Sequence, residues 1–330
     1  MKKINLGNSG LMASEIALGC MRINGMEVND LEAYVHTALE CGVDFFDHAD
    51  IYGGGESEAV FGKLLKQSPE LREQMVLQSK CGIRPGRYDF SKEHILESVE
   101  GSLKRLQTDH LDVLLLHRPD ALMEPDEVAE AFTALETSGK VRYFGVSNFN
   151  SRQLELLQSS LKQKILVNQL QLSIMHTGMI DHALRTNTDF CHAEDRDGEI
   201  LDYCRLKGIT IQAWSPFQYG FFEGVFVDNE KFPELNKTLA ELSEKYGISK
   251  TALCVAWIQR HPARIQTIVG TTNPKRLQDI CTAGNVRLSR EDWYRTRHNS
   301  KIPAENKNCF LPGNFFCQAL SLGFATRAAR

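Results

Sequence analysis

A regular alternation of short apolar runs with stretches of helical periodicity is the feature that most constrains the fold of this chain. The apolar runs predict strands over residues 16–21, 43–47, 75–80, 111–117, 140–146, 165–170, 209–214 and 265–269. Helical patterns cover residues 30–40, 57–66, 91–106, 126–138, 151–160, 199–207, 234–260 and 274–283. Strands that alternate with helices pair in parallel through right-handed crossovers, and this many units favours a closed barrel.

We therefore expect an α/β protein built as a single (β/α)₈ TIM barrel. Residues 2–14 predict a small N-terminal β-hairpin that turns at residues 7–10. An open doubly wound sheet is the structural alternative. Against it, residues 19–25 after the first strand lack the G-x-G-x-x-G turn that would seat a pyrophosphate on the first helix.

No clean domain boundary interrupts this alternation. Residues 1–297 are expected to form the barrel, and residues 298–330 a C-terminal tail of uncertain structure. Two long segments, residues 172–198 and 217–232, leave the carboxyl ends of predicted strands. Because long loops at that end of a barrel usually bind or cover ligands, we expect extra loops and helices at the C-terminal face.

Composition excludes several classes of partner. The 330 residues include 42 acidic and 38 basic side chains, and a net charge of -4 gives no electrostatic footprint for nucleic acid or anionic membrane. No apolar run is long enough for a membrane span, and the N-terminus lacks the apolar core of a signal peptide. The nine cysteines include no CxxC pair, which indicates free thiols in the cytoplasm and no metal site. The oligomeric state stays open.

Four chemically reactive side chains follow three successive predicted strands. Asp47 ends the second strand, with Tyr52 shortly after it, while Lys80 ends the third and His117 the fourth. A tyrosine hydroxyl can protonate a carbonyl oxygen, but its ordinary pKa near ~10 makes it a poor acid at neutral pH. A charged Lys80 beside it would lower that pKa, and Asp47 would keep the lysine protonated. His117 could then orient the carbonyl oxygen.

Each of these residues alone has a simpler explanation. Asp47 could cap the next helix, Lys80 could be a solvated side chain, and His117 could be a satisfied core histidine. Tyr52 could be a partly buried aromatic residue. Their placement at successive strand ends, which converge in a barrel, favours the catalytic interpretation.

Four segments resemble the aldo-keto reductase superfamily, and within it a bacterial branch of oxidoreductases. They are residues 44–58, 79–82, 111–119 and 139–149, and the resemblance spans roughly residues 1–297. It implies a catalytic tetrad in which Tyr52 is the general acid, Lys80 and Asp47 tune it, and His117 orients the substrate. It also implies NADP(H), bound in extended form across the barrel mouth without a metal, with NAD(H) as an alternative.

The same resemblance implies contacts to the cofactor. Ser147, Asn148 and Gln169 match positions at the carboxamide, Trp214 replaces a usual Tyr stacked on the nicotinamide, and Ser215 matches a pyrophosphate contact. Backbone contacts are expected from Gly19, Cys20 and Met21.

The implied 2′-phosphate site is formed by Gly270, Thr271, Arg276 and Asp279. This segment departs from the family pattern, because Gly270 stands where many members have a Lys, Asp279 replaces a usual Glu, and Ile280 a usual Asn. A preference for NADP is therefore implied but not fixed.

The implied enzyme is an NADP-dependent oxidoreductase that reduces aldehydes or ketones to alcohols, and acts as an alcohol dehydrogenase in reverse. The alternative is a cofactor-binding regulatory or redox-sensing subunit with little turnover, as in the related subunits of potassium channels. A hydrolase on the same barrel is disfavoured, because no nucleophile lies next to a base.

The substrate would be a small carbonyl compound whose identity the sequence does not specify. Loops after strands four, six and seven supply the expected pocket residues Arg118, Met175, His176, Phe217, Tyr219, Phe221 and Phe222. Their aromatic rings suggest an apolar or ring-bearing substrate, although packing of these rings on the barrel rim is an equal alternative.

Overall fold

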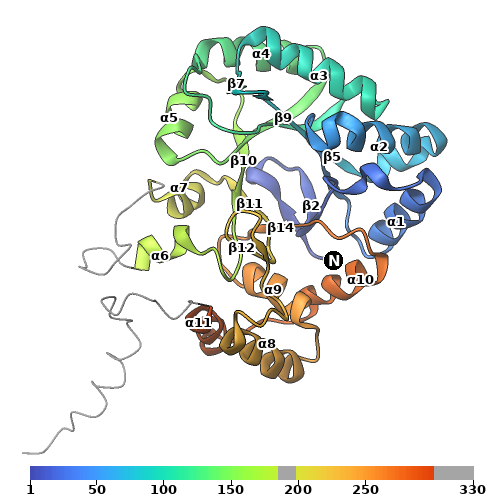
Figure 1. The fold of residues 1–330 in the computed structure, drawn as a ribbon. Coiled ribbons are helices and arrows are strands. Elements are labelled where there is room, and N and C mark those ends of the chain that lie inside the picture. Colours follow the sequence, from blue (N-terminus) through green and yellow to red (C-terminus); the bar gives the residue numbers. More distant parts are fainter. Residues whose placement is uncertain (185–197, 301–330) are drawn as a thin grey trace, which may run out of the picture.

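Eight parallel strands close into a single barrel in the computed structural model, which describes residues 1–184 and 198–300 (Figure 1). The strands follow one another around the barrel in chain order, and β14 pairs with β3 to close it. Their bounds are β3 (Ile16–Gly19), β4 (Phe45–Asp47), β5 (Val76–Cys81), β8 (Leu111–Leu116), β9 (Val141–Ser147), β10 (Ile165–Gln171), β11 (Thr210–Trp214) and β14 (Gln266–Val269). The predicted TIM barrel is confirmed, and the open sheet is excluded.

Helices surround the strands on the outside of the barrel. They are α1 (Val28–Glu40), α2 (Glu56–Gln67), α3 (Lys92–Leu106), α4 (Pro125–Thr137), α5 (Ser151–Ser160), α6 (Gly178–Leu184), α7 (Ile200–Lys207), α8 (Pro233–Tyr246), α9 (Lys250–Gln259), α10 (Pro274–Cys281) and α11 (Arg290–Asn299). Capping side chains determine where several of these helices begin. For example, α5 begins with a capping box in which the side chains of Asn150 and Gln153 bond each other's backbone N–H.

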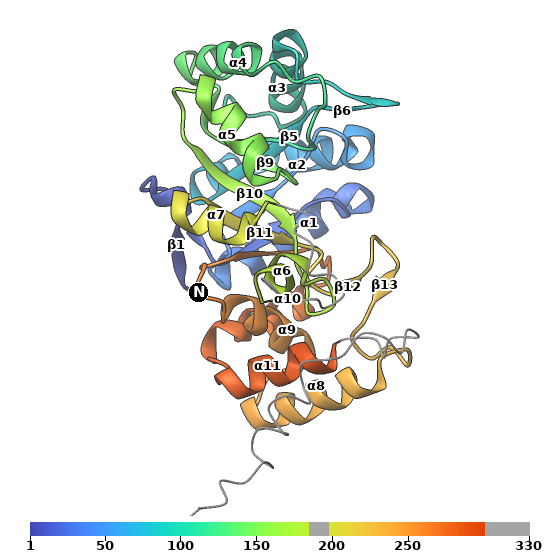
Figure 2. The same ribbon diagram turned by 90° about the vertical axis from the view of Figure 1, so that its left-hand side faces the viewer.

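The predicted N-terminal hairpin is also present, as β1 (Lys3–Asn5) paired with β2 (Met12–Ser14). It lies at the end of the barrel opposite the hairpin β12 (Gln218–Tyr219) and β13 (Gly224–Val225) (Figure 2). Between its strands, Leu6 is fully buried, and Gly7 approaches so closely that a Cβ there would lie 2.7 Å from the Leu166 Cα. The hairpin therefore plugs the amino-terminal end of the barrel and leaves the other end for a ligand.

The barrel interior changes from apolar to polar along the strands. On β5 the inward positions are Val76, Gln78 and Lys80, because side chains two residues apart share a face. Val76 belongs to an apolar cluster with Phe45 and Leu166, whereas Gln78 and Lys80 are buried polar residues nearer the carboxyl end. This gradient places the charged groups at the end that the plug leaves open.

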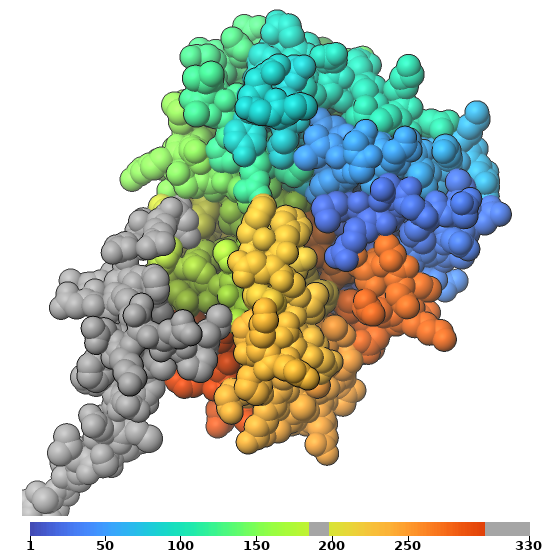
Figure 3. Space-filling view, viewed as in Figure 1, coloured from blue at the N-terminus to red at the C-terminus, as the bar shows by residue number. Residues whose placement is uncertain are grey.

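The predicted extra structure at the C-terminal face is found as α6 and the β12–β13 hairpin, which fall in the two long segments after the sixth and seventh strands. In Figure 3 the yellow segment that contains β12 and β13 crosses the middle of the face seen in Figure 1. A second small hairpin, β6 (Ile83–Arg84) with β7 (Arg87–Tyr88), follows the third barrel strand and was not predicted.

Two helical details differ from the sequence expectations. The predicted helical region 234–260 is two helices, because Gly247 adopts a left-handed conformation that ends α8, and the Ser249 side chain caps α9. Helix α11 was not predicted and extends past residue 297 to Asn299. Trp293 packs this helix against α9, because its ring stacks on that of Trp257 with 4.8 Å between the ring centroids. The rest of the expected tail, residues 301–330, lies outside the described residues.

Within the described residues, no helix is long and apolar enough to cross a bilayer.

Replacing Gly62 by alanine should destabilise the barrel. A Cβ at Gly62 on α2 would lie 1.9 Å from the Arg105 carbonyl oxygen at the end of α3, so the two helices must separate. We expect the free energy of unfolding, measured by urea denaturation, to fall by about 1–3 kcal/mol. Gly101→Ala is the matched control, because its Cβ meets only the flexible Arg105 guanidinium. Equal stability of the two variants would contradict this account of the α2–α3 contact.

Candidate active site

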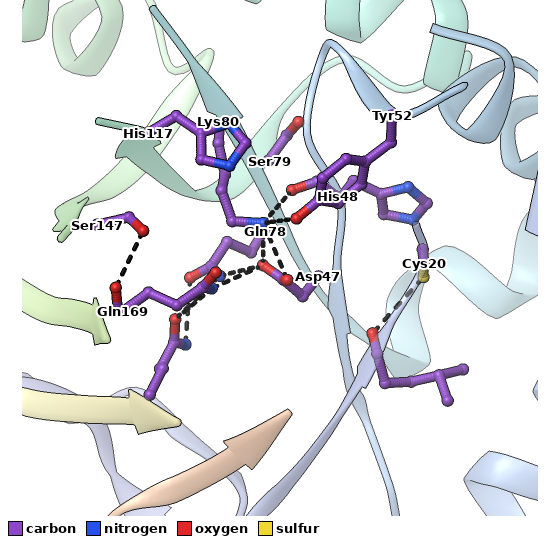
Figure 4. Close-up of polar contacts among 12 residues, drawn as sticks. Cys20, Asp47, His48, Tyr52, Gln78, Ser79, Lys80, His117, Ser147 and Gln169 are labelled. Carbon is purple, nitrogen blue, oxygen red and sulfur yellow. Dashed lines mark hydrogen bonds and ion pairs between the residues drawn. The ribbon is translucent and has the colours of Figure 1, made fainter. Parts of the chain in front are cut away.

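A buried lysine lies at the centre of the candidate site. The Lys80 side chain is fully buried, and its ammonium donates hydrogen bonds to three groups (Figure 4). Nζ lies 2.9 Å from Asp47 Oδ2, 3.0 Å from the Tyr52 hydroxyl and 2.7 Å from the His48 carbonyl oxygen, and it also lies 2.8 Å from Asp47 Oδ1. Strands β4 and β5 create this arrangement, since they are neighbours and both end at the open mouth. The structure thus brings three of the four predicted catalytic residues into direct contact.

The groups in this cluster shift one another's pKa values. Burial lowers the pKa of Lys80, but the Asp47 carboxylate and the Tyr52 hydroxyl outweigh it, so that the pKa is raised overall and the lysine stays charged. Burial raises the pKa of Tyr52, and the Lys80 ammonium opposes that rise without reversing it. The sequence argument expected a net lowering. In the structure, Tyr52 therefore holds its proton at neutral pH.

Tyr52 and His117 face each other at the mouth. Tyr52 precedes Gly53, Gly54 and Gly55, whose φ angles of 59°, 67° and 97° favour glycine and turn the chain into α2. The His117 ring meets the Tyr52 ring edge-on, with 5.9 Å between centroids. Burial, helped by the nearby Lys80 and Arg118 charges, lowers the pKa of His117 well below its ordinary value. The imidazole is therefore neutral at neutral pH.

A layer of buried amides lies beneath Asp47, and the sequence predicted a role for only one of them, Gln169, as a cofactor contact. Gln78 Nε2 lies 2.5 Å and Gln169 Nε2 3.1 Å from Asp47 Oδ1, and both amides also donate to Gln212 Oε1. Gln212 in turn donates to Gln266 Oε1 at 2.8 Å. Their positions inside the predicted strands were the available signal, since a buried amide needs partners. The layer holds the Asp47 carboxylate from below while Lys80 holds it from above.

A cavity of about 810 Å³ opens above this cluster, a size typical of ligand-binding sites. Asp47, Tyr52 and His117 line it, whereas Lys80 lies behind them. Most of the predicted cofactor residues also line it: Gly19, Met21, Ser147, Asn148, Gln169, Trp214, Ser215, Gly270, Thr271 and Arg276. Cys20 and Asp279 do not. Cys20 is buried, and Asp279 accepts hydrogen bonds from Ser249 and Thr251 at the start of α9.

Three of the cavity residues form a connected polar edge. The Ser147 hydroxyl donates to the Gln169 carbonyl oxygen at 3.0 Å, and Asn148 Nδ2 donates to the Ser147 Oγ at 2.7 Å. The Trp214 indole N–H lies 3.3 Å from Asn148 Oδ1, which fixes the ring on the cavity wall. A planar amide ligand could find both hydrogen-bond partners and a flat aromatic surface here.

The opposite end of the cavity is basic. Arg276 is exposed in the first turn of α10, where the backbone N–H groups favour an anion. Arg22, a residue that the sequence reasoning missed, also lines the cavity, and its guanidinium lies 3.5 Å from where a Cβ at Gly270 would be. Its position directly after Met21 was the available signal. Two arginines and a helix N-terminus suit a phosphate-bearing ligand.

Of the expected substrate-pocket residues, Arg118, Phe217, Phe221 and Phe222 line the cavity. Met175, His176 and Tyr219 do not. No group of three or more metal-binding side chains lies together in the described part of the chain.

The Aldo/keto reductase family model matches residues 15–299. The oxidoreductase YdhF of Escherichia coli is 36% identical to this chain, covering 90% of it and 97% of YdhF. The 6-dehydroglucose reductase of Agrobacterium fabrum is 35% identical over 89% of this chain and 96% of its own. The crystal structure of the thermostable aldo-keto reductase Tm1743 superposes with a TM-score of 0.74 at 27% identity, covering 91% of this chain and 100% of Tm1743.

Acid should destabilise the fold partly through His48, to which the sequence assigned no role. Burial and the Lys80 charge lower the pKa of His48 to about 3, and neither ring nitrogen has a hydrogen-bond partner among the described residues. Because the unfolded chain binds this proton near pH ~6.5, stability is lost as the pH falls below that value. The expected loss from His48 between pH 7 and pH 4 is about 3 kcal/mol.

His48→Leu removes this titration and should shrink the difference in unfolding free energy between the two pH values by that amount, as measured by urea denaturation. Substitution of the exposed His36 by glutamine is the control. An unchanged pH dependence in His48→Leu would show that this histidine is not held neutral.

Proposed function

This chain belongs to the aldo/keto reductase family, and we propose that it is an NADP(H)-dependent reductase of aldehydes or ketones. The observation that carries the proposal is the Lys80 ammonium, which joins the Asp47 carboxylate to the Tyr52 hydroxyl at the base of the cavity. A protonated phenol beside a buried cation is suited to give up a proton as negative charge develops on a nearby oxygen.

Each of the four residues has a distinct part in the proposed reaction. A nicotinamide cofactor, when bound, supplies the hydride that the carbonyl carbon receives. Tyr52 gives its hydroxyl proton to the carbonyl oxygen, which becomes the hydroxyl of the alcohol product. Lys80 stabilises the phenolate left on Tyr52, and Asp47 keeps Lys80 charged. Neutral His117 orients the carbonyl oxygen toward Tyr52.

The residues around the cavity fit such a cofactor. Ser147, Asn148 and Gln169 offer hydrogen-bond groups for the carboxamide, and Trp214 offers a flat face for the nicotinamide ring. Arg276 and the α10 N-terminus fit the 2′-phosphate of NADP. We propose that Arg22 also binds the 2′-phosphate, because its guanidinium reaches the space that a side chain at position 270 would occupy. NAD(H) remains the alternative cofactor.

We also propose a small-molecule carbonyl substrate and a cytoplasmic location. The name of the Agrobacterium relative supports an aldehyde substrate, so 6-dehydroglucose belongs in a substrate panel. The location is supported by the cysteine usage, because nine cysteines without a CxxC pair are typical of thiols in a reducing compartment.

Tyr52→Phe should lower kcat by about 10²- to 10⁴-fold, because it removes the proton donor. The affinity for NADPH, measured by fluorescence titration, should stay nearly unchanged. Tyr203→Phe on α7, outside the cavity, is the control. Undiminished carbonyl reduction by Tyr52→Phe would exclude Tyr52 as the acid. Tight NADPH binding by the wild-type protein without turnover of any carbonyl would instead favour the regulatory subunit.

Arg276→Met should raise the KM for NADPH by about tenfold, the effect of losing one charge-assisted phosphate contact, and leave the KM for NADH unchanged. The neighbouring Lys275, which does not line the cavity, provides the matched control variant Lys275→Met. Equal effects on the two cofactors would place the 2′-phosphate elsewhere.

A further inference from the structure

Arg118 is a cation in the part of the cavity that the substrate is expected to occupy. Arg118 follows His117 directly and lines the cavity with it. The cavity is also lined by apolar and aromatic side chains, among them Ile51, Ile83, Trp214, Phe217 and Phe221. Arg22 and Arg276 belong to the opposite end, near Gly270 and α10. Arg118 is therefore the charged group that a substrate would meet beyond the carbonyl.

Aromatic rings hold Arg118 in place. Its guanidinium carbon lies 5.8 Å from the Trp214 ring centroid and 5.7 Å from that of Phe221. Such cation–π contacts restrain the guanidinium, and none of its N–H groups donates to a side chain of the described residues. Phe221 lies between β12 and β13 and is 61% exposed. The contact between Arg118 and Phe221 therefore lies at the cavity entrance.

The charge of Arg118 has no acidic partner within residues 1–184 and 198–300. The two carboxylates that line the cavity are already paired, Asp47 with Lys80 and Asp228 with Lys250. The Arg118 charge also acts on His117, since it is one of the charges that lower the pKa of that imidazole. A cation next to the proposed reaction centre, with no acidic partner in this part of the chain, attracts an anionic ligand.

We propose that Arg118 binds an anionic group on the substrate, so that the preferred substrate is a carbonyl compound with an apolar or aromatic body and a carboxylate. A guanidinium restrained by neighbouring rings can bind a carboxylate with two parallel N–H···O hydrogen bonds. The apolar walls then contact the body of the molecule, and the carbonyl lies at Tyr52 and His117. This inference rests on the proposed reductase function and names its substrate class.

Matched substrate pairs test the charge directly. The 3- and 4-carboxybenzaldehydes are compared with their methyl esters, which keep the ring and the aldehyde but lose the charge. The wild-type enzyme should favour at least one acid over its ester by about tenfold or more in kcat/KM, the value of one charge-assisted contact. In Arg118→Met this acid-to-ester ratio should fall toward one, and Arg118→Lys should keep part of it.

Two controls separate charge from other roles of Arg118. Arg87→Met, which changes an arginine on β7 that does not line the cavity, should keep the wild-type ratio. A ratio near one in the wild-type enzyme would overturn the proposal, as would a wild-type ratio retained in Arg118→Met. An equal gain with neutral 4-(hydroxymethyl)benzaldehyde would also overturn it, because Arg118 would then act as a hydrogen-bond donor without need of an anion.

A binding measurement keeps this test independent of turnover. Calorimetry of 4-methylbenzoate and its methyl ester, with and without NADP⁺, should show tighter binding of the acid to the wild-type protein and loss of that difference in Arg118→Met. Equal binding of acid and ester to the wild-type protein would contradict the anion site. Reduction of neither acids nor esters would contradict the reductase function instead.

Discussion

The buried ion pair between Asp47 and Lys80 is the interaction on which the rest of the site depends. Taking both charges out of water costs several kcal/mol per ion, so the pair is stable only if its remaining hydrogen-bonding groups are satisfied. The structure meets this condition on both sides. The Lys80 ammonium reaches the Tyr52 hydroxyl and the His48 carbonyl oxygen, and Asp47 accepts from the amides of Gln78 and Gln169. The proposed acid is thus one of the groups that make the burial of the lysine tolerable.

The barrel explains how residues so far apart in sequence meet at one point. Parallel strands direct their carboxyl ends to the same mouth, and the N-terminal hairpin closes the other end. Every second side chain of a strand points into the barrel. These inward residues are apolar near the N-terminal hairpin, amides in the next layer, and the Asp47–Lys80 ion pair at the open mouth. The same geometry places Arg22 and Arg276 near α10 at one end of the cavity and Arg118 beside His117 at the other, two regions suited to two different ligands.

The sequence predicted the strands and the residues at their ends because both leave strong local signals. Apolar runs of strand length mark β4, β5 and β8, and Asp47, Lys80 and His117 stand where those runs stop. The features that the sequence did not predict depend on tertiary contacts or on the conformation of a single residue. The net rise in the pKa of Tyr52 comes from burial, which no local pattern reports. The break between α8 and α9 depends on the conformation of Gly247, and helix α11 is recognised only through the Trp257–Trp293 stack.

The central claim is that this site delivers a hydride and a proton to the same carbonyl group. A single turnover of benzaldehyde with NADPH deuterated at both C4 positions tests it most directly, with the benzyl alcohol examined by NMR. The account predicts one deuterium at the carbinol carbon for each cofactor oxidised. Cofactor oxidation that leaves no deuterium in the alcohol would contradict it.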